Sequence, residues 1–74
     1  MTRLANISGR EAVRVFEKLG YSLERQSSSH MVLHCPGKQP LVIPDHKELA
    51  PNLLRSQIKL AGITDNEFLR LKKS

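Results

Sequence analysis

Three histidines and a run of serines are the residues of this chain that could do chemistry. Residues 27–35 read SSSHMVLHC, so three serines lead directly into His30 and an apolar, strand-like segment. An imidazole titrates near about pH 6.5, so it can accept and release protons at cellular pH. The hydroxyls and amides of Ser28 and Ser29 could contact a phosphate. His30 is therefore the candidate catalytic residue, and the plainer alternative is an exposed histidine at a strand edge.

The other histidines and several basic residues could assist such a site. His34 would share the strand face of His30, and His46 lies in a predicted loop, where it could assist His30 or bind phosphate. Cations along a surface can follow a phosphate backbone, which adds affinity without reading sequence. Ordinary solvent-exposed positions remain the alternative for each of them. The basic candidates are Lys38, Lys47, Arg55 and Lys59.

Length and composition limit the class of protein. With 74 residues, the chain predicts one domain spanning positions 1–74, with a small core and an open rather than a deep site. Lys and Arg number 12 against 7 Asp and Glu, a net charge of +5 that favours a nucleic-acid partner. Cys35 is the only cysteine, which favours a reducing cytoplasm and disfavours a zinc site. We expect no cofactor, no signal peptide and no membrane span.

Helical periodicity is clearest between residues 8 and 20. Ser8 and Glu11 have the spacing of a capping box, and Gly20 stands where a left-handed helix cap is expected. The apolar face of this helix consists of Ala12, Val15, Phe16 and Leu19.

Three strands are predicted at residues 21–26, 30–34 and 40–44, with a turn at 36–39. The connections are short, so the strands should form an antiparallel meander. Alternation places His30, Val32 and His34 on an open face. The opposite, buried face is predicted to consist of Tyr21, Leu23, Met31, Leu33, Leu41 and Ile43.

A second helix is predicted from near Pro51 to Gly62, and Thr64 with Glu67 opens a short C-terminal helix. The apolar stripe of the second helix is predicted to contain Leu53, Leu54, Ile58, Leu60 and Ala61. The order helix, three strands, helix and short helix predicts an α+β fold in which the helices pack on one face of the sheet.

Four segments, taken in order, carry a resemblance to a known family. They are GREAVRVFEKLGY, LERQSSSH, VIPDH and LAPNLLRSQIKLAGITDNEF, and together they cover most of the chain from Ser8 to Phe68. In this order and spacing they resemble the HicA-type toxins, which are small mRNA interferases of bacterial and archaeal toxin–antitoxin pairs. The resemblance implies a fold like that of a double-stranded RNA-binding domain.

The resemblance also assigns roles to particular positions. The family's catalytic histidine lies in a Gly-Ser-His element at the start of the second strand, which corresponds to Ser28-Ser29-His30. Here Ser28 replaces the glycine, and a positive φ at this position would strain a serine. The family's proline and histidine after the third strand correspond to Pro44 and His46, and its Leu-Arg-Ser run corresponds to residues 54–56.

The function that the resemblance implies is a toxin with metal-independent endoribonuclease activity. It would cleave mRNA and be neutralised by a HicB-like antitoxin protein. His30 would be a general base or acid while a ribose 2′-hydroxyl attacks the adjacent phosphate, with Lys47 and Arg55 stabilising charge. Two other classes stay open: a non-catalytic RNA-binding module of the same fold, and a domain that only binds protein.

Overall fold

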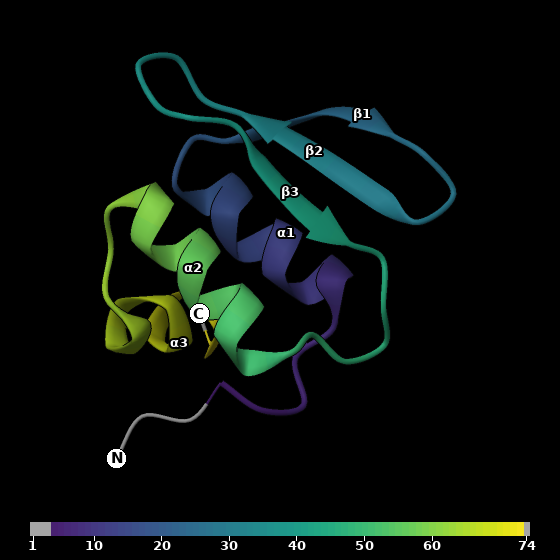
Figure 1. Cartoon of the computed structure of the whole chain (residues 1–74). Coiled ribbons are helices and arrows are strands. Elements are labelled where there is room, and N and C mark those ends of the chain that lie inside the picture. The colour runs from purple at the N-terminus through teal and green to yellow at the C-terminus, as the bar shows by residue number, and fades with distance from the viewer. Residues whose placement is uncertain (1–3, 74) are drawn as a thin grey trace.

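The computed structural model describes residues 4–73, which form three helices and one antiparallel sheet (Figure 1). The predicted order of elements is confirmed. The elements are α1 (Gly9–Lys18), β1 (Ser22–Gln26), β2 (His30–His34), β3 (Leu41–Pro44), α2 (Pro51–Ala61) and α3 (Asp65–Lys73).

The sheet is the predicted meander, with the strands in the order β1-β2-β3. In β2, Met31 lies opposite Ile43 and Leu33 lies opposite Leu41, and all four side chains are buried. His30 lies opposite Pro44 at the end of the same ladder. One face of the central strand is therefore packed, and the face that carries His30 is not covered by helices.

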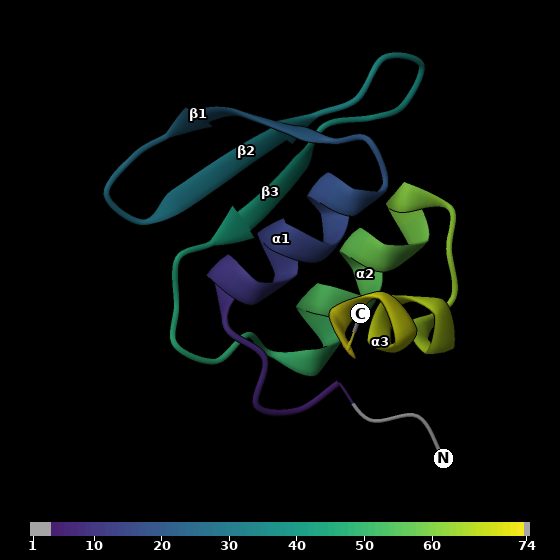
Figure 2. The same ribbon diagram turned by 180° about the vertical axis from the view of Figure 1, so that it is seen from behind.

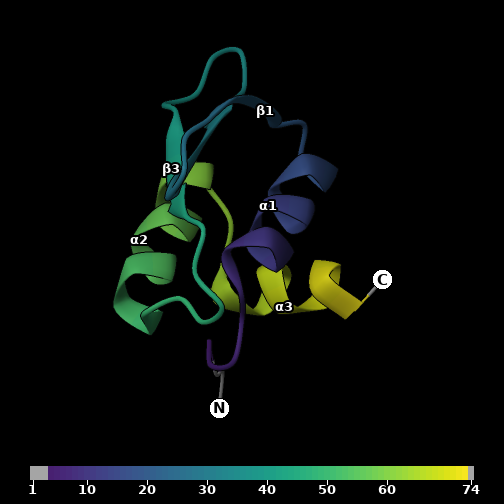
Figure 3. The ribbon, with the colours of Figure 1, turned by 90° about the vertical axis from the view of Figure 1, so that its right-hand side faces the viewer.

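The helices lie together on one side of the sheet, which gives the predicted α+β arrangement. Figures 1 and 2 show α1 and α2 beneath the strands, and Figure 3 shows α3 beneath α1 and α2, on the side away from the sheet. Phe68 of α3 meets Phe16 of α1 with ring centroids 5.4 Å apart, and both are fully buried. The third helix thus closes the bottom of the core.

The start of α1 is fixed by the capping box that the sequence predicts. The amide of Glu11 donates to Ser8 Oγ at 3.1 Å, and the amide of Ser8 donates to Glu11 Oε1 at 3.0 Å. At the other end, Gly20 takes a φ of 103°, which ends the helix and turns the chain into β1. Because both ends are set locally, the position of α1 under the sheet is well defined.

Ionisation of the Glu11 carboxyl should make the stability of the protein depend on pH in the acid range. The Ser8 amide, with Lys72 adding a smaller effect and burial opposing, holds the pKa of Glu11 below its usual value. A lowered folded-state pKa means that this stabilisation is present above the unfolded pKa and is lost as pH falls through the folded one. The variant Glu11→Gln keeps an acceptor but no charge, so it should melt at a lower temperature than the unmodified chain at neutral pH. Thermal unfolding followed by circular dichroism should show that the difference in melting temperature between the two chains disappears in acid. A difference that stays constant with pH would mean that the charge of Glu11 is not its cause.

Two apolar side chains predicted for the core are instead exposed. Leu23 faces the helices opposite Leu33 but is 40% exposed, because it lies on an edge strand next to a β-bulge that interrupts the register between Leu23 and Arg25. Leu60 is 42% exposed, because the buried line of α2 runs through Leu54, Ile58 and Ala61.

Candidate active site

His30 is the first residue of β2, directly after the loop of residues 27–29, and it is exposed. The loop is closed by the backbone of His30: the Ser27 amide donates to the His30 carbonyl at 2.9 Å, and the His30 amide donates to Ser27 Oγ at 3.2 Å. These two bonds hold the imidazole at the end of the sheet. An exposed ring in a fixed backbone frame can reach a substrate.

The imidazole has a neighbour that orients it. Ser29 Oγ lies 3.1 Å from His30 Nδ1, which is hydrogen-bonding distance for either tautomer. Because Ser29 contacts Nδ1, Nε2 is the ring nitrogen that would exchange a proton with a substrate. A serine at this distance would hold the ring in one orientation, which general acid–base catalysis requires.

The backbone of the serine loop is compatible with serine at position 28. Among residues 4–73, Asn6 is the only residue other than glycine with a positive φ. Ser28 therefore adopts ordinary backbone angles, and the strain considered for this replacement of the family's glycine does not arise.

Three segments that are distant in the sequence meet at the His30 end of the sheet. The Asp45 amide donates to the Ser29 carbonyl at 2.9 Å, and the Gly9 amide donates to the His46 carbonyl at 2.9 Å. The serine loop, the loop after β3 and the start of α1 are therefore joined, and all three lie on the right in Figure 1. The exposed residues His46 and Lys47 come to this end with them.

Arg10 is a cation of this site that the sequence did not single out. Its Nε lies 3.3 Å and its Nη2 3.4 Å from the two carboxylate oxygens of Asp45. The Arg10 side chain is 73% exposed, so the ion pair adds little stability. Its effect is to hold a guanidinium beside the loop that contacts Ser29.

Arg25 is a second basic residue near His30. Strict alternation would place it on the same face as Leu23, but the bulge shifts the register so that Arg25 lies opposite Val32. Directly paired residues share a face of the sheet, so Arg25 shares the open face with His30.

Three of the predicted basic residues do not lie with His30. Lys38 Nζ donates to the Ala61 carbonyl at 2.9 Å and lies 5.9 Å from the centroid of the Tyr21 ring, at the opposite end of the sheet. Arg55 Nε donates to Asp65 Oδ2 at 3.1 Å and so joins α2 to α3. Lys59 is exposed in the last turn of α2, also towards the far end. Their roles in RNA binding stay predictions, but they would serve a distant part of a substrate.

The remaining candidate groups are dispersed. His34 Nδ1 lies 3.7 Å from Glu24 Oε2 on the open face, and Cys35 is half-buried against the core. Within residues 4–73, no three side chains of His, Cys, Asp or Glu gather in a way that could hold a metal ion. No helix in this part of the chain is long and apolar enough to span a membrane.

The fold and the site together define a class of protein. Three antiparallel strands followed by α2 and preceded by α1 give a fold like that of a double-stranded RNA-binding domain, with an exposed histidine at the start of β2. A family model described as HicA toxin of bacterial toxin–antitoxin matches residues 9–63, which is more than half of the chain and includes every strand, α1 and α2. The chain belongs to the HicA toxin family: it is a toxin of a toxin–antitoxin system, and membership implies an antitoxin partner. No curated protein gives a significant match to it.

Proposed function

We propose that this toxin is an endoribonuclease that cleaves mRNA, with His30 as its general acid or base. The observation that carries the proposal is the exposed imidazole at the start of β2, with Ser29 Oγ at 3.1 Å from its Nδ1. Family membership supports it, because HicA toxins are ribonuclease toxins. Ser28 and Ser29 would bind the RNA backbone beside the ring.

The chemistry needs only one phosphodiester and its neighbouring ribose. The 2′-oxygen forms a bond to phosphorus, the bond from phosphorus to the 5′-oxygen breaks, and the products are a 2′,3′-cyclic phosphate and a 5′-hydroxyl. His30 accepts the proton of the 2′-hydroxyl or donates one to the departing 5′-oxygen, and water at the open site completes the other transfer. No metal ion enters this mechanism.

Positive charge would stabilise the phosphorane on the way to products. Lys47 and Arg10 lie at the His30 end of the sheet and are suited to this role, with His46 in the same loop as Lys47. Arg55, expected from the sequence to take part, joins α2 to α3 through Asp65 and so would lie further from the phosphate that is cut. We therefore assign Arg10 in its place and keep Arg55, Lys38 and Lys59 as candidates for more distant phosphates.

The cellular setting follows from the same proposal. We propose that the 74 residues form one domain, that the toxin acts in the cytoplasm, and that its antitoxin is a HicB-like protein. The net charge of +5 suits both RNA and an acidic partner surface.

Incubation of the purified chain with labelled RNA in EDTA tests the proposal. Single-stranded RNA should be cut, and its new ends should carry 2′,3′-cyclic phosphate and 5′-hydroxyl groups. The fold also supports a different outcome, in which duplex RNA is bound by its shape and nothing is cut. Retention of duplex without cleavage would reject the nuclease and favour the binding module.

A further inference from the structure

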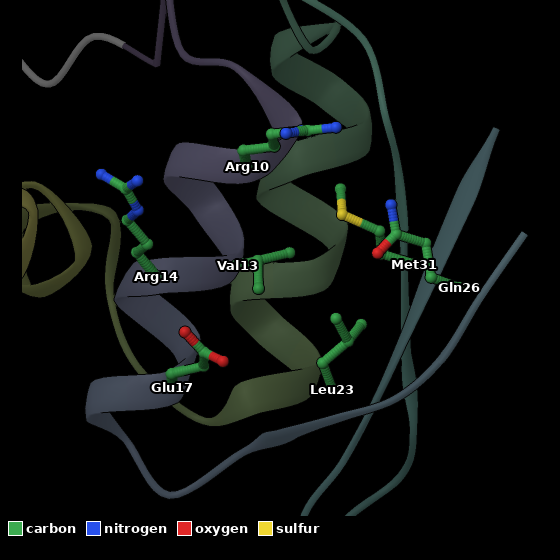
Figure 4. Close-up of a pocket in the computed structure, with 7 residues that line it drawn as sticks. All are labelled: Arg10, Val13, Arg14, Glu17, Leu23, Gln26 and Met31. Atoms are coloured by element: carbon green, nitrogen blue, oxygen red, sulfur yellow. The ribbon is translucent and has the colours of Figure 1, made fainter. Parts of the chain in front are cut away.

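A groove lies between α1 and the hairpin of β1 and β2, on the helix side of the sheet (Figure 4). Its volume is about 290 Å³. Val13, Leu23 and Met31 form its floor, and Figure 4 shows these three side chains gathered between the helix and the strands. Leu23 is the exposed part of this floor, so the groove offers an apolar surface that the fold itself leaves uncovered.

Two polar side chains lie at one end of the groove, Arg10 from α1 and Gln26 from β1. Gln26 is brought there by the β-bulge, because the shifted register places it opposite Met31, on the helix side. By uninterrupted alternation it would lie on the open face. The bulge thus puts an amide, which both donates and accepts, next to an apolar floor.

The polar end of the groove adjoins the candidate active site. Gln26 is the residue before the serine loop, and Met31 is the residue after His30. Arg10 is linked to the imidazole through three contacts: Arg10 to Asp45 at 3.3 Å, the Asp45 amide to the Ser29 carbonyl at 2.9 Å, and Ser29 Oγ to His30 Nδ1 at 3.1 Å. His30 and Met31 are consecutive in β2 and so project to opposite faces, and a strand that presents a phosphate to His30 would reach the groove by passing round the end of the sheet, where Arg10 and Asp45 lie.

We infer that this groove binds one nucleotide of single-stranded RNA next to the phosphate that is cut, and reads its base. The inference rests on the proposed function. The base would lie on Leu23 and Val13, the Gln26 amide would bond to the base edge, and Arg10 would contact the phosphate that is cut, in the role proposed for it above. Amide side chains pair with base edges through two hydrogen bonds, and unpaired bases of single strands are the usual target of sequence reading in RNA.

The charge along the groove favours RNA and limits the length bound. The Arg10 side chain is 73% exposed although its partner Asp45 is only 20% exposed, so the guanidinium can turn from this carboxylate to a phosphate, with which it forms a strong charge-assisted pair. Arg14 is a second cation that lines the groove, and Glu17 lines the other end, seven residues beyond Arg10 along α1, which is about 10 Å. Arg10 and Arg14 favour a phosphate in the groove and Glu17 disfavours a second one at its other end, so the groove suits a single nucleotide.

Three variants test this assignment. Leu23→Ala and Arg10→Ala, each in a His30→Ala chain, should weaken binding of a short fluorescein-labelled single-stranded RNA by about tenfold in anisotropy titrations. Arg70→Ala, an exposed charge loss on α3, is the matched control and should change it less than about threefold. In the chain that keeps His30, Gln26→Ala should still cut, but sequencing of the ends from a randomised RNA pool should show a weaker base preference beside the cut.

The outcomes separate this inference from the function on which it rests. Unchanged RNA affinity in Leu23→Ala and an unchanged base preference in Gln26→Ala would overturn the nucleotide site while leaving His30-dependent cleavage intact. The same result is expected if the groove takes a protein segment. A chain that neither binds nor cuts single strands would overturn both proposals. Melting temperatures near that of the unmodified chain show that a loss of binding is not a loss of fold.

Discussion

Replacing His30 with alanine is expected to abolish RNA cleavage while leaving the fold unchanged. A positioned group that transfers protons contributes about 10²–10⁴-fold to a rate, and His30 is the imidazole that the serine loop holds in place. The side chain is exposed, so its loss should change the free energy of unfolding by no more than about 0.5 kcal/mol. Initial rates on labelled single-stranded RNA, with thermal unfolding measured in parallel, give both quantities.

The control for this prediction is another histidine on the same strand. His34 is exposed, lies on the same sheet face and pairs with Glu24 away from the serine loop. His34→Ala should therefore retain a rate within about threefold of the unmodified chain, as expected for a surface substitution. Induced expression gives a second readout: growth should arrest with His34→Ala and continue with His30→Ala. Equal rates for the two variants would reject His30 as the catalytic residue.

The elements that the sequence predicted well are those whose signals are local. Each capping box needs two residues three positions apart, and both Ser8 with Glu11 and Thr64 with Glu67 form the expected pairs of hydrogen bonds. Period-two alternation in β2 and β3 likewise identified the buried residues of these strands. A short-range pattern is enough because the interaction that it describes is itself short-range.

The parts that the sequence did not predict depend on contacts between distant segments. Arg10 and Asp45 are 35 residues apart, and no spacing rule connects them. Leu4, Ile7 and Leu49 are buried although they lie in irregular segments, where no periodicity marks them; the Leu49 amide donates to the Ile7 carbonyl at 2.8 Å. The bond from Lys38 Nζ to the Ala61 carbonyl was likewise not predicted, and the expected role of Lys38 in RNA binding stays a prediction.

The bulge in β1 shows how one local irregularity alters a site. It separates the face of Leu23 from that of Arg25, so an arginine joins the face of His30 and Gln26 joins the helix side. Nothing in residues 22–26 signals this bulge, because no glycine is present to mark it. A prediction from alternation alone therefore assigns both side chains to the wrong face.

Replacing Gly9 with alanine is expected to cause the largest loss of stability among alanine substitutions at the four glycines of this protein. Alanine normally stabilises a helix by up to about 1 kcal/mol relative to glycine. A steric clash at this position must therefore cost more than this gain in order to destabilise the protein. A Cβ on Gly9 would overlap the Pro44 carbonyl oxygen and lie 3.1 Å from the Pro44 carbonyl carbon and 3.2 Å from Met31 Cε. Two of these atoms are backbone, which cannot turn aside as a flexible side chain can.

The free energy of unfolding should fall by about 1–3 kcal/mol, which is the usual cost of overpacking. A domain of this size has a net stability of only about 3–5 kcal/mol. The melting temperature should fall by about 4–8 °C for each kcal/mol of stability lost. Gly37→Ala is the control: Gly37 has a φ of 83° but nothing within 4 Å of the added Cβ, so only backbone strain of about 1–2 kcal/mol is expected. Thermal unfolding compares the two, and a larger loss in Gly37→Ala would contradict the close approach of α1 to β3.

The same substitution should also reach the candidate active site. The Gly9 amide donates to the His46 carbonyl, and the Asp45 amide donates to the Ser29 carbonyl, so moving α1 away from Pro44 pulls on the loop that positions the serines beside His30. RNA cleavage at a temperature where Gly9→Ala is still folded should therefore be slower than in Gly37→Ala, whose glycine lies in the turn at the other end of the sheet. Equal rates would mean that the loop after β3 holds its place without the start of α1, and that the serine loop orients the imidazole through Ser27 and Ser29 alone.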